Sequence, residues 1–247
     1  MAIMLTQIII ANFIVSLGSV VGAIPLLIKS KKIKNFLIFF VSLSAGTLMG
    51  GAFIHLIPEA SEKLNVGLTS KITLISFGGF LLLEKLLHWH HNHNPQKQKP
   101  TKQILGYMNL AGDLVHNFID GATIAATFSL SRDLGIATTI AIFMHEVPQE
   151  LGDMGVLLHA GFSKIEAVLL NFLTALSAVL GGILGFCFIQ SSRNLIPYLL
   201  AVAAGGFIYI SASDLVPEIK SETKLKQSLI SLLIFGLGIL IMVWLKD

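Results

Sequence analysis

Long apolar segments, separated by short polar stretches, run through most of this 247-residue chain. A helix needs about 20 mostly apolar residues to cross the hydrocarbon core of a bilayer. By that criterion the pattern predicts eight membrane-spanning helices, at residues 4–28, 35–57, 71–90, 104–129, 134–159, 164–189, 195–216 and 226–245. The predicted fold class is an all-α membrane protein: eight transmembrane helices in a compact bundle, forming a single domain over residues 1–247.

Composition supports the membrane class. The chain is 54% hydrophobic and 13% charged, whereas soluble domains carry about 25% charged residues. The net charge of +3 does not indicate a nucleic-acid partner, because the basic residues lie in short loops and not on one face. Cys187 is the only cysteine, which excludes a disulfide framework and a CxxC metal motif.

The basic residues also predict an orientation. Most of the 17 Lys and Arg residues lie in the loops after the first, third, fifth and seventh predicted spans. Cytoplasmic loops of membrane proteins carry an excess of Lys and Arg. We therefore expect a multi-pass protein of the cell membrane, surrounded by lipid, with both termini on the extracytoplasmic side.

The fourth and fifth predicted spans carry polar residues at membrane depth, in the motifs GDLVHNFIDG (112–121) and HEVPQELGD (145–153). Each motif has polar residues at i, i+1 and i+4, and positions i and i+4 share one face of a helix. The six residues at this spacing are His116, Asn117, Asp120, His145, Glu146 and Gln149. If the two faces meet, their donor atoms would form a cage of the size that a metal ion needs.

Further acids extend both polar stripes: Asp113 on the fourth span, and Glu150 and Asp153 on the fifth. An unpaired charge near the bilayer centre costs about 2.5–3.5 kcal/mol even on the more lenient scale. A bound cation would offset several such charges at once. The two spans are therefore predicted to carry a pathway for metal ions or protons, since helix–helix hydrogen bonds alone explain so many polar groups poorly.

The donor types narrow the choice of metal. Imidazole and carboxylate without thiolate suit Zn²⁺, Fe²⁺ or Mn²⁺ better than Cu⁺, Mg²⁺ or Ca²⁺. Pro148 adds a further polar group, because it cannot donate a hydrogen bond to the carbonyl of Met144. In a membrane that carbonyl needs a neighbouring donor, a water molecule or an ion.

Two other polar features lie outside these spans. The loop at 88–103, expected on the cytoplasmic side, contains His88, His90, His91 and His93. Such a tract is either a solvated loop or a weak metal-gathering segment, and its place beside the other metal candidates favours the second interpretation. A faint repeat also relates GGAFIHLIPE to GGFIYISASDLVPE, with His55 and Asp214 in equivalent positions that would extend the path.

The motifs HNFIDG and HEVPQELGD resemble the signature of the Zrt/Irt-like (ZIP) metal transporters, in particular the subfamily with HNFxDG and HExPHExGD. The resemblance extends to the eight spans, the His-rich loop and the motifs HLIPE and DLVPE. It implies uptake of divalent metal toward the cytoplasm through a two-metal site between spans four and five, in a homodimer. The implied substrate is Zn²⁺, with Fe²⁺, Mn²⁺, Co²⁺ or Cd²⁺ as alternatives.

By motif position, the resemblance implies metal ligands at the six spaced residues named above and at Glu150, which the motif retains. It implies a transport path that continues through His55, Asp113, Asp153 and Asp214. The sequence departs from the subfamily where Gln149 replaces the second His of HExPHE. An amide is a weaker ligand than imidazole, so we expect one fully formed metal site and a weaker or absent second one.

Three alternatives differ in class. An intramembrane zinc metallohydrolase would use an HExxH motif, but Gln149 stands at the second His and Pro148 bends the helix between the would-be ligands. A metal sensor would need a signalling domain, and a proton-coupled organic-solute carrier would not need matched polar triplets on adjacent spans. The sequence therefore predicts a transporter and not an enzyme.

Overall fold

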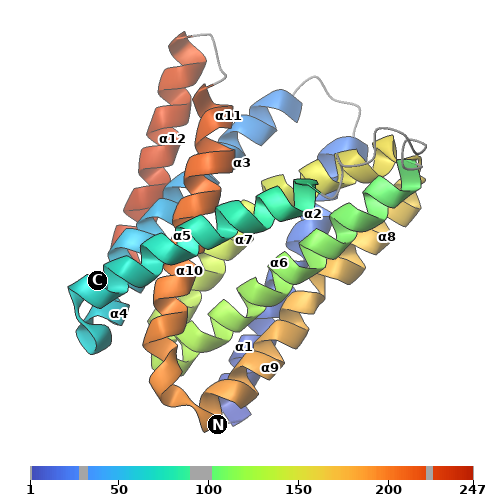
Figure 1. The fold of residues 1–247 in the computed structure, drawn as a ribbon. Helices are drawn as coiled ribbons and strands as arrows, with labels where there is room; N and C mark the ends of the chain where they lie inside the picture. Colours follow the sequence, from blue (N-terminus) through green and yellow to red (C-terminus); the bar gives the residue numbers. More distant parts are fainter. Residues whose placement is uncertain (1, 28–32, 90–101, 221–224, 247) are drawn as a thin grey trace.

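A computed structural model of the chain describes residues 2–27, 33–89, 102–220 and 225–246. This part of the chain is all-helical and contains no strand. Its elements are α1 (Ala2–Ser16), α2 (Gly18–Leu27), α3 (Ile33–Gly50), η1 (Gly51–Leu56), α4 (Ile57–Leu64), α5 (Val66–Trp89), α6 (Lys102–Leu130), α7 (Arg132–His159), α8 (Lys164–Ala175), α9 (Ser177–Ser191), η2 (Arg193–Leu195), α10 (Ile196–Ile210), η3 (Ser211–Leu215), α11 (Val216–Lys220) and α12 (Leu225–Trp244). Figure 1 shows them as a bundle of long helical rods.

The all-helical class predicted from the sequence is confirmed. Within the described residues, five helical rods are long and apolar enough to cross a membrane: Ala2–Ile24, Ile38–Leu64, Lys164–Ser191, Ile196–Lys220 and Leu225–Trp244. A shorter apolar helix runs over Val66–Leu82. The helices α6 and α7 contain 29 and 28 residues but also the polar motifs, and neither is among the five.

The turn between α6 and α7 positions the polar motifs. Only Ser131 separates the two helices, and its Oγ accepts a hydrogen bond from the backbone N–H of Leu134 at 3.1 Å. Such a cap satisfies one of the free N–H groups at a helix start. The chain therefore reverses within one residue, so α6 and α7 lie side by side and residues 116–120 come opposite 145–146.

Two π-helical turns interrupt the rods that contain the sequence repeat. The segment η1 ends two residues before Pro58, and η3 ends two residues before Pro217. A π-turn changes the register of the backbone hydrogen bonds, and proline cannot donate one. The similarity between the two sequence segments thus has a counterpart in the backbone, and His55 lies within the first of the two turns.

The closest helix packing is between α6 and α9. A Cβ atom built on Gly121 of α6 would collide with the backbone carbonyl of Ala178, and one built on Gly181 of α9 with that of Phe118. Small residues allow such backbone approach between helices in a membrane. In the same bundle α2 packs on α7, α3 on α12, and α5 on α10, while α3 also contacts α7.

The outer surface of the bundle is apolar. Large hydrophobic side chains are exposed on helices throughout the described part, among them Leu74, Ile75, Ile165, Leu233 and Leu240. A soluble protein rarely exposes apolar patches of this extent, whereas lipid is their natural surrounding. The first turn of α1 and the last turn of α12 lie toward the same end of the bundle (Figure 1).

Candidate metal centre

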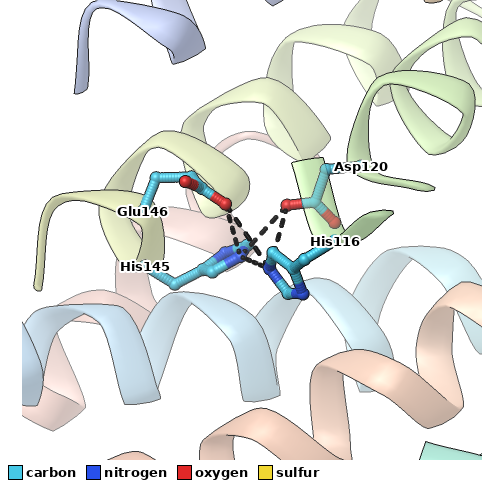
Figure 2. A group of neighbouring side chains, drawn as sticks. All are labelled: His116, Asp120, His145 and Glu146. Atoms are coloured by element: carbon cyan, nitrogen blue, oxygen red, sulfur yellow. Dashed lines mark hydrogen bonds and ion pairs between the residues drawn. The ribbon is translucent and has the colours of Figure 1, made fainter. Parts of the chain in front are cut away.

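Four donor side chains from α6 and α7 point toward one another between the two helices (Figure 2). His116 and Asp120 lie one turn apart on α6, while His145 and Glu146 are consecutive on α7. The two Nε2 atoms are 3.3 Å apart. His145 Nε2 lies 3.1 Å from Asp120 Oδ2 and 3.6 Å from Glu146 Oε1. His116 Nε2 lies 3.7 Å and 3.4 Å from the same two oxygens.

These separations match the spacing of ligands around a tetrahedral zinc ion. Zn–N and Zn–O bonds of about 2.0–2.1 Å place neighbouring ligand atoms about 3.3–3.4 Å apart in a tetrahedron. The five distances given above fall between 3.1 and 3.7 Å. Asp120 Oδ2 and Glu146 Oε1 are buried and have no hydrogen-bond partner of good geometry. The group can therefore hold a divalent ion after only small side-chain movements.

The group lies inside the protein, and of its four side chains His116 is the most exposed. His145 and Glu146 are each 1% exposed and Asp120 is 4% exposed, while the side chain of His116 is 20% exposed. His145 Nδ1 lies 3.3 Å from the carbonyl oxygen of Ala141, which can only accept a hydrogen bond. In the tautomer that carries its proton on Nδ1, this contact is a hydrogen bond and the lone pair of Nε2 is directed at the group, as in a metal-ligating histidine.

A second group of carboxylates lies nearby on the same two helices. Asp113 of α6 and Glu150 and Asp153 of α7 each offer an oxygen, and these oxygens lie within 4.8 Å of one another. Asn117 donates its amide to Asp113 Oδ1 at 2.8 Å, and Asn109 donates to Asp153 Oδ1 at 2.9 Å. The sequence pattern indicated each of these acids singly, but it did not indicate that the three would meet.

The structure thus divides the residues expected as ligands. His116, Asp120, His145 and Glu146 come together, whereas Glu150 lies in the carboxylate group. The amide of Asn117 donates to the backbone oxygen and the side chain of Asp113. Gln149 is half-buried and lies one turn beyond His145 on the same face of α7.

The carbonyl that Pro148 leaves without a backbone donor has a protein partner. Ser44 of α3 donates its hydroxyl to the carbonyl oxygen of Met144. Asn171 of α8 makes a comparable contact by donating to the carbonyl of Glu150 at 3.1 Å. Of the three partners that the sequence left open for this carbonyl, the structure selects a neighbouring donor. The contact also ties α3 to the site helix.

The remaining residues expected on the path lie elsewhere. His55 is buried in η1, its Nε2 lies 2.8 Å from the carbonyl oxygen of Met242, and it lines a pocket of about 260 Å³ with Glu59, Glu62 and Asp133. The side chains of His88 and Asp214, and all of His90, His91 and His93, fall outside the described residues. Sequence reasoning named the three acids of the carboxylate group but missed that they come together. The signal for this group was the matched i, i+3 spacing of Glu150 and Asp153 opposite Asp113.

A helical bundle with membrane-length apolar rods and a buried group of imidazole and carboxylate donors is typical of a multi-pass membrane protein with a candidate metal centre. The family model described as ZIP zinc transporter matches residues 3–104 and 97–246. The chain belongs to this family. The resemblance to the ZIP family is confirmed, and relatives that match this chain are zinc transporters by name.

Individual relatives of the chain are also named as zinc transporters. The chain is 34% identical over 219 residues to the zinc transporter ZIP13 of Pongo abelii, covering 82% of this chain and 65% of the relative. It is 33% identical over 225 residues to the zinc transporter YKE4 of Saccharomyces cerevisiae, covering 79% and 65%. With the human zinc transporter ZIP4 the identity is 42% over 126 residues, which cover 51% of this chain and 19% of the relative. The chain thus spans slightly under two thirds of the length of the first two relatives.

Proposed function

We propose that this protein transports divalent transition-metal ions, with Zn²⁺ as the main substrate, across a membrane toward the cytoplasm. The observation that carries the proposal is the set of donors from His116, Asp120, His145 and Glu146, whose separations suit a tetrahedral ion. Names of the relatives, which are zinc transporters, support the same substrate. Fe²⁺, Mn²⁺, Co²⁺ and Cd²⁺ are the alternative substrates that a mixed imidazole and carboxylate site would accept.

The proposal includes an eight-span topology in which α6 and α7 are the fourth and fifth spans. The polar faces of α6 and α7 are buried against neighbouring helices, which shields the acids from lipid. This burial supports the placement of both helices within the membrane. Both termini face away from the cytoplasm in this arrangement, in the cell membrane, and the functional unit is a homodimer. The excess of basic residues in alternate loops supports the orientation.

A path for the ion follows from the polar groups at the two ends of this site. On the extracytoplasmic side, the pocket lined by His55, Glu59, Glu62 and Asp133 attracts cations because three of these residues are acidic. On the cytoplasmic side, the loop containing His88 gathers metal weakly, and Asp214 lies along the route. Mixed imidazole and carboxylate ligands exchange more readily than thiolates do. Transport requires such exchange, because the ion must leave the site again.

Metal competition on purified protein in liposomes tests the proposal. We expect uptake of Zn²⁺ that an excess of unlabelled Zn²⁺ abolishes, with weaker inhibition by Fe²⁺, Mn²⁺, Co²⁺ or Cd²⁺. Vesicles without protein give the background rate. A reconstituted protein that moves none of these ions above the background rate would refute the proposal, and cleavage of peptide or lipid by the same sample would favour the metallohydrolase alternative.

The Gln149→His variant restores the subfamily motif beside the candidate site. We expect zinc to bind this variant roughly tenfold more tightly or better, because an imidazole replaces a neutral amide one turn from His145 and each tenfold change corresponds to about 1.4 kcal/mol. Titration of the detergent-solubilised protein with a competing zinc dye measures the affinity. Gln149→Asn, which keeps the amide, is the matched control. Unchanged affinity in both variants would show that position 149 is not a ligand.

Deletion of residues 88–94 removes the His-rich segment. We expect the maximal rate of zinc uptake to stay within about twofold of wild type and the half-saturating concentration to rise, because weak gathering sites act by raising the local ion concentration. Uptake measured over a range of zinc concentrations separates the two quantities. Complete loss of uptake in a correctly inserted protein would contradict a gathering role and make the segment essential.

A further inference from the structure

The carbonyl of Met144 lies at a point where helix α7 needs a donor from outside. In a regular α-helix this oxygen accepts a hydrogen bond from the N–H of residue 148, which here is a proline and has none. The ring of a proline also clashes with the carbonyl of the residue four positions earlier. Met144 is bonded directly to His145, so this carbonyl belongs to the turn that bears two donors of the candidate site, His145 and Glu146.

Ser44 of α3 supplies the missing donor. Its side chain is fully buried, and its hydroxyl donates to the carbonyl oxygen of Met144 across the contact between α3 and α7. The buried hydroxyls of Ser42 and Thr47 on the same helix donate instead to carbonyls within α3. Of these three described hydroxyls, the one that bonds to α7 is therefore the one opposite the proline-freed carbonyl.

This hydrogen bond fixes the backbone from which His145 projects. The carbonyl oxygen of Met144 and the nitrogen of His145 lie in one rigid peptide plane. Holding the oxygen therefore holds the orientation of that plane, and rotation of the plane would turn the imidazole. The tolerance is small, because His145 Nε2 lies 3.1 Å from Asp120 Oδ2 on the opposite helix, close to the separation of neighbouring ligands around a zinc ion.

We propose that Ser44 is a positioning residue for metal binding: its hydroxyl holds the Met144 carbonyl that Pro148 leaves without a helical donor, and thereby aims His145 at the ion. Ser44 acts through the backbone of α7 and not as a ligand. The importance of this role for uptake rests on the proposed transport function, whereas its effect on metal affinity does not. Hydrogen bonds from outer residues orient the ligands of metal sites, and their loss costs about 10–100-fold in metal affinity.

Zinc affinity and the visible absorption of bound Co²⁺ test this role in the full-length protein in detergent. A competing zinc dye gives the affinity, while the Co²⁺ band reports the coordination geometry, which is characteristic of a metal site. We expect Ser44→Ala to bind Zn²⁺ about tenfold more weakly and to weaken the Co²⁺ band. Ser44→Thr keeps a hydroxyl and is expected to restore both quantities. Ser42→Ala, which removes an equally buried hydroxyl bonded within α3, is the matched control, with wild-type values expected.

Replacement of Pro148 distinguishes positioning from general packing. Pro148→Ala gives residue 148 an N–H for the Met144 carbonyl, so the hydroxyl of Ser44 becomes redundant. In that background, Ser44→Ala is expected to leave the zinc affinity and the Co²⁺ band of Pro148→Ala unchanged, whereas the effects of independent sites would add. Comparison of the double variant with Pro148→Ala also decides the role of Ser44 if Ser44→Ala alone fails to fold.

Three results would overturn the positioning role: wild-type zinc affinity in Ser44→Ala, an equal loss of affinity in the wild-type and Pro148→Ala backgrounds, or the absence of zinc binding to wild type. Flux in liposomes separates this role from the transport function. If wild type binds zinc but moves none, transport fails, yet the affinities still decide the role of Ser44. With transport established, the half-saturating zinc concentration is expected to rise about tenfold in Ser44→Ala.

Discussion

Replacement of Asp120 or His145 with alanine is expected to reduce zinc flux by about 100-fold or more, because loss of even an outer partner of a metal ligand costs 10–100-fold. The two side chains approach each other at 3.1 Å from different helices, and both are almost fully buried. Either truncation leaves the ion with three protein donors at most. Three protein donors cannot complete the tetrahedral coordination of the ion.

Flux of radioactive zinc into liposomes measures this effect, and size-exclusion chromatography verifies that each variant remains folded. His159→Ala is the matched control, since His159 lies on the exposed last turn of the same helix α7. We expect that control to transport at the wild-type rate. Wild-type flux in Asp120→Ala or His145→Ala would refute the assignment of the four-donor site.

Replacement of Gly121 with leucine is expected to remove most of the folded protein. A Cβ atom at this position would already collide with the backbone of Ala178, and backbone cannot move aside as a flexible side chain can. Overpacking in a dense core costs about 1–3 kcal/mol for small additions. A leucine adds several atoms beyond Cβ at the α6–α9 contact, and it would push α6 away from its partner.

Fluorescence-detected size-exclusion chromatography before and after heating measures the folded fraction of this variant. Gly79→Leu on α5 is the matched control, because a Cβ atom at Gly79 has no neighbour within 4 Å. Gly121→Ala should show an intermediate loss, with a Tm lowered by roughly 2–12 °C for a chain of this length. A Gly121→Leu protein as stable as Gly79→Leu would show that α6 and α9 do not pack as described.

Much of the site could be predicted from the sequence because helical periodicity alone places residues on faces. The spacing of His116 and Asp120 puts both on one side of α6, and the polar motif in α7 is recognisable by its acids. The helical class followed from the length of the apolar segments. Which of the polar residues meet was not predictable, because it depends on the rotation of each helix about its axis and on its register against its neighbour.

Particular residues show this limit. Asn117 has the spacing of a ligand; its Nδ2 donates to Asp113, while its Oδ1, the atom that a metal would bind, is buried without a hydrogen-bond partner. Glu150 has a place in the ligand motif, yet it faces Asp113 and Asp153. The carbonyl of Met144 looked available to an ion, and it accepts a hydrogen bond from Ser44, a residue 100 positions away. The contacts of Glu150 with Asp113 and of Met144 with Ser44 depend on how helices meet, which no local pattern encodes, whereas Asn117 and Asp113 lie one turn apart on α6.

The sequence by itself determined the helical membrane class, the family and the two helices that bear the donors, because hydropathy, charge and motif spacing are local properties of the chain. Only the tertiary structure decided that the donors divide into an imidazole–carboxylate group and an all-carboxylate group. The reason is physical: a helix exposes several polar residues along one stripe, and the single-residue turn at Ser131 fixes which level of α6 faces which level of α7. That register joins His116 to His145 and Asp113 to Glu150.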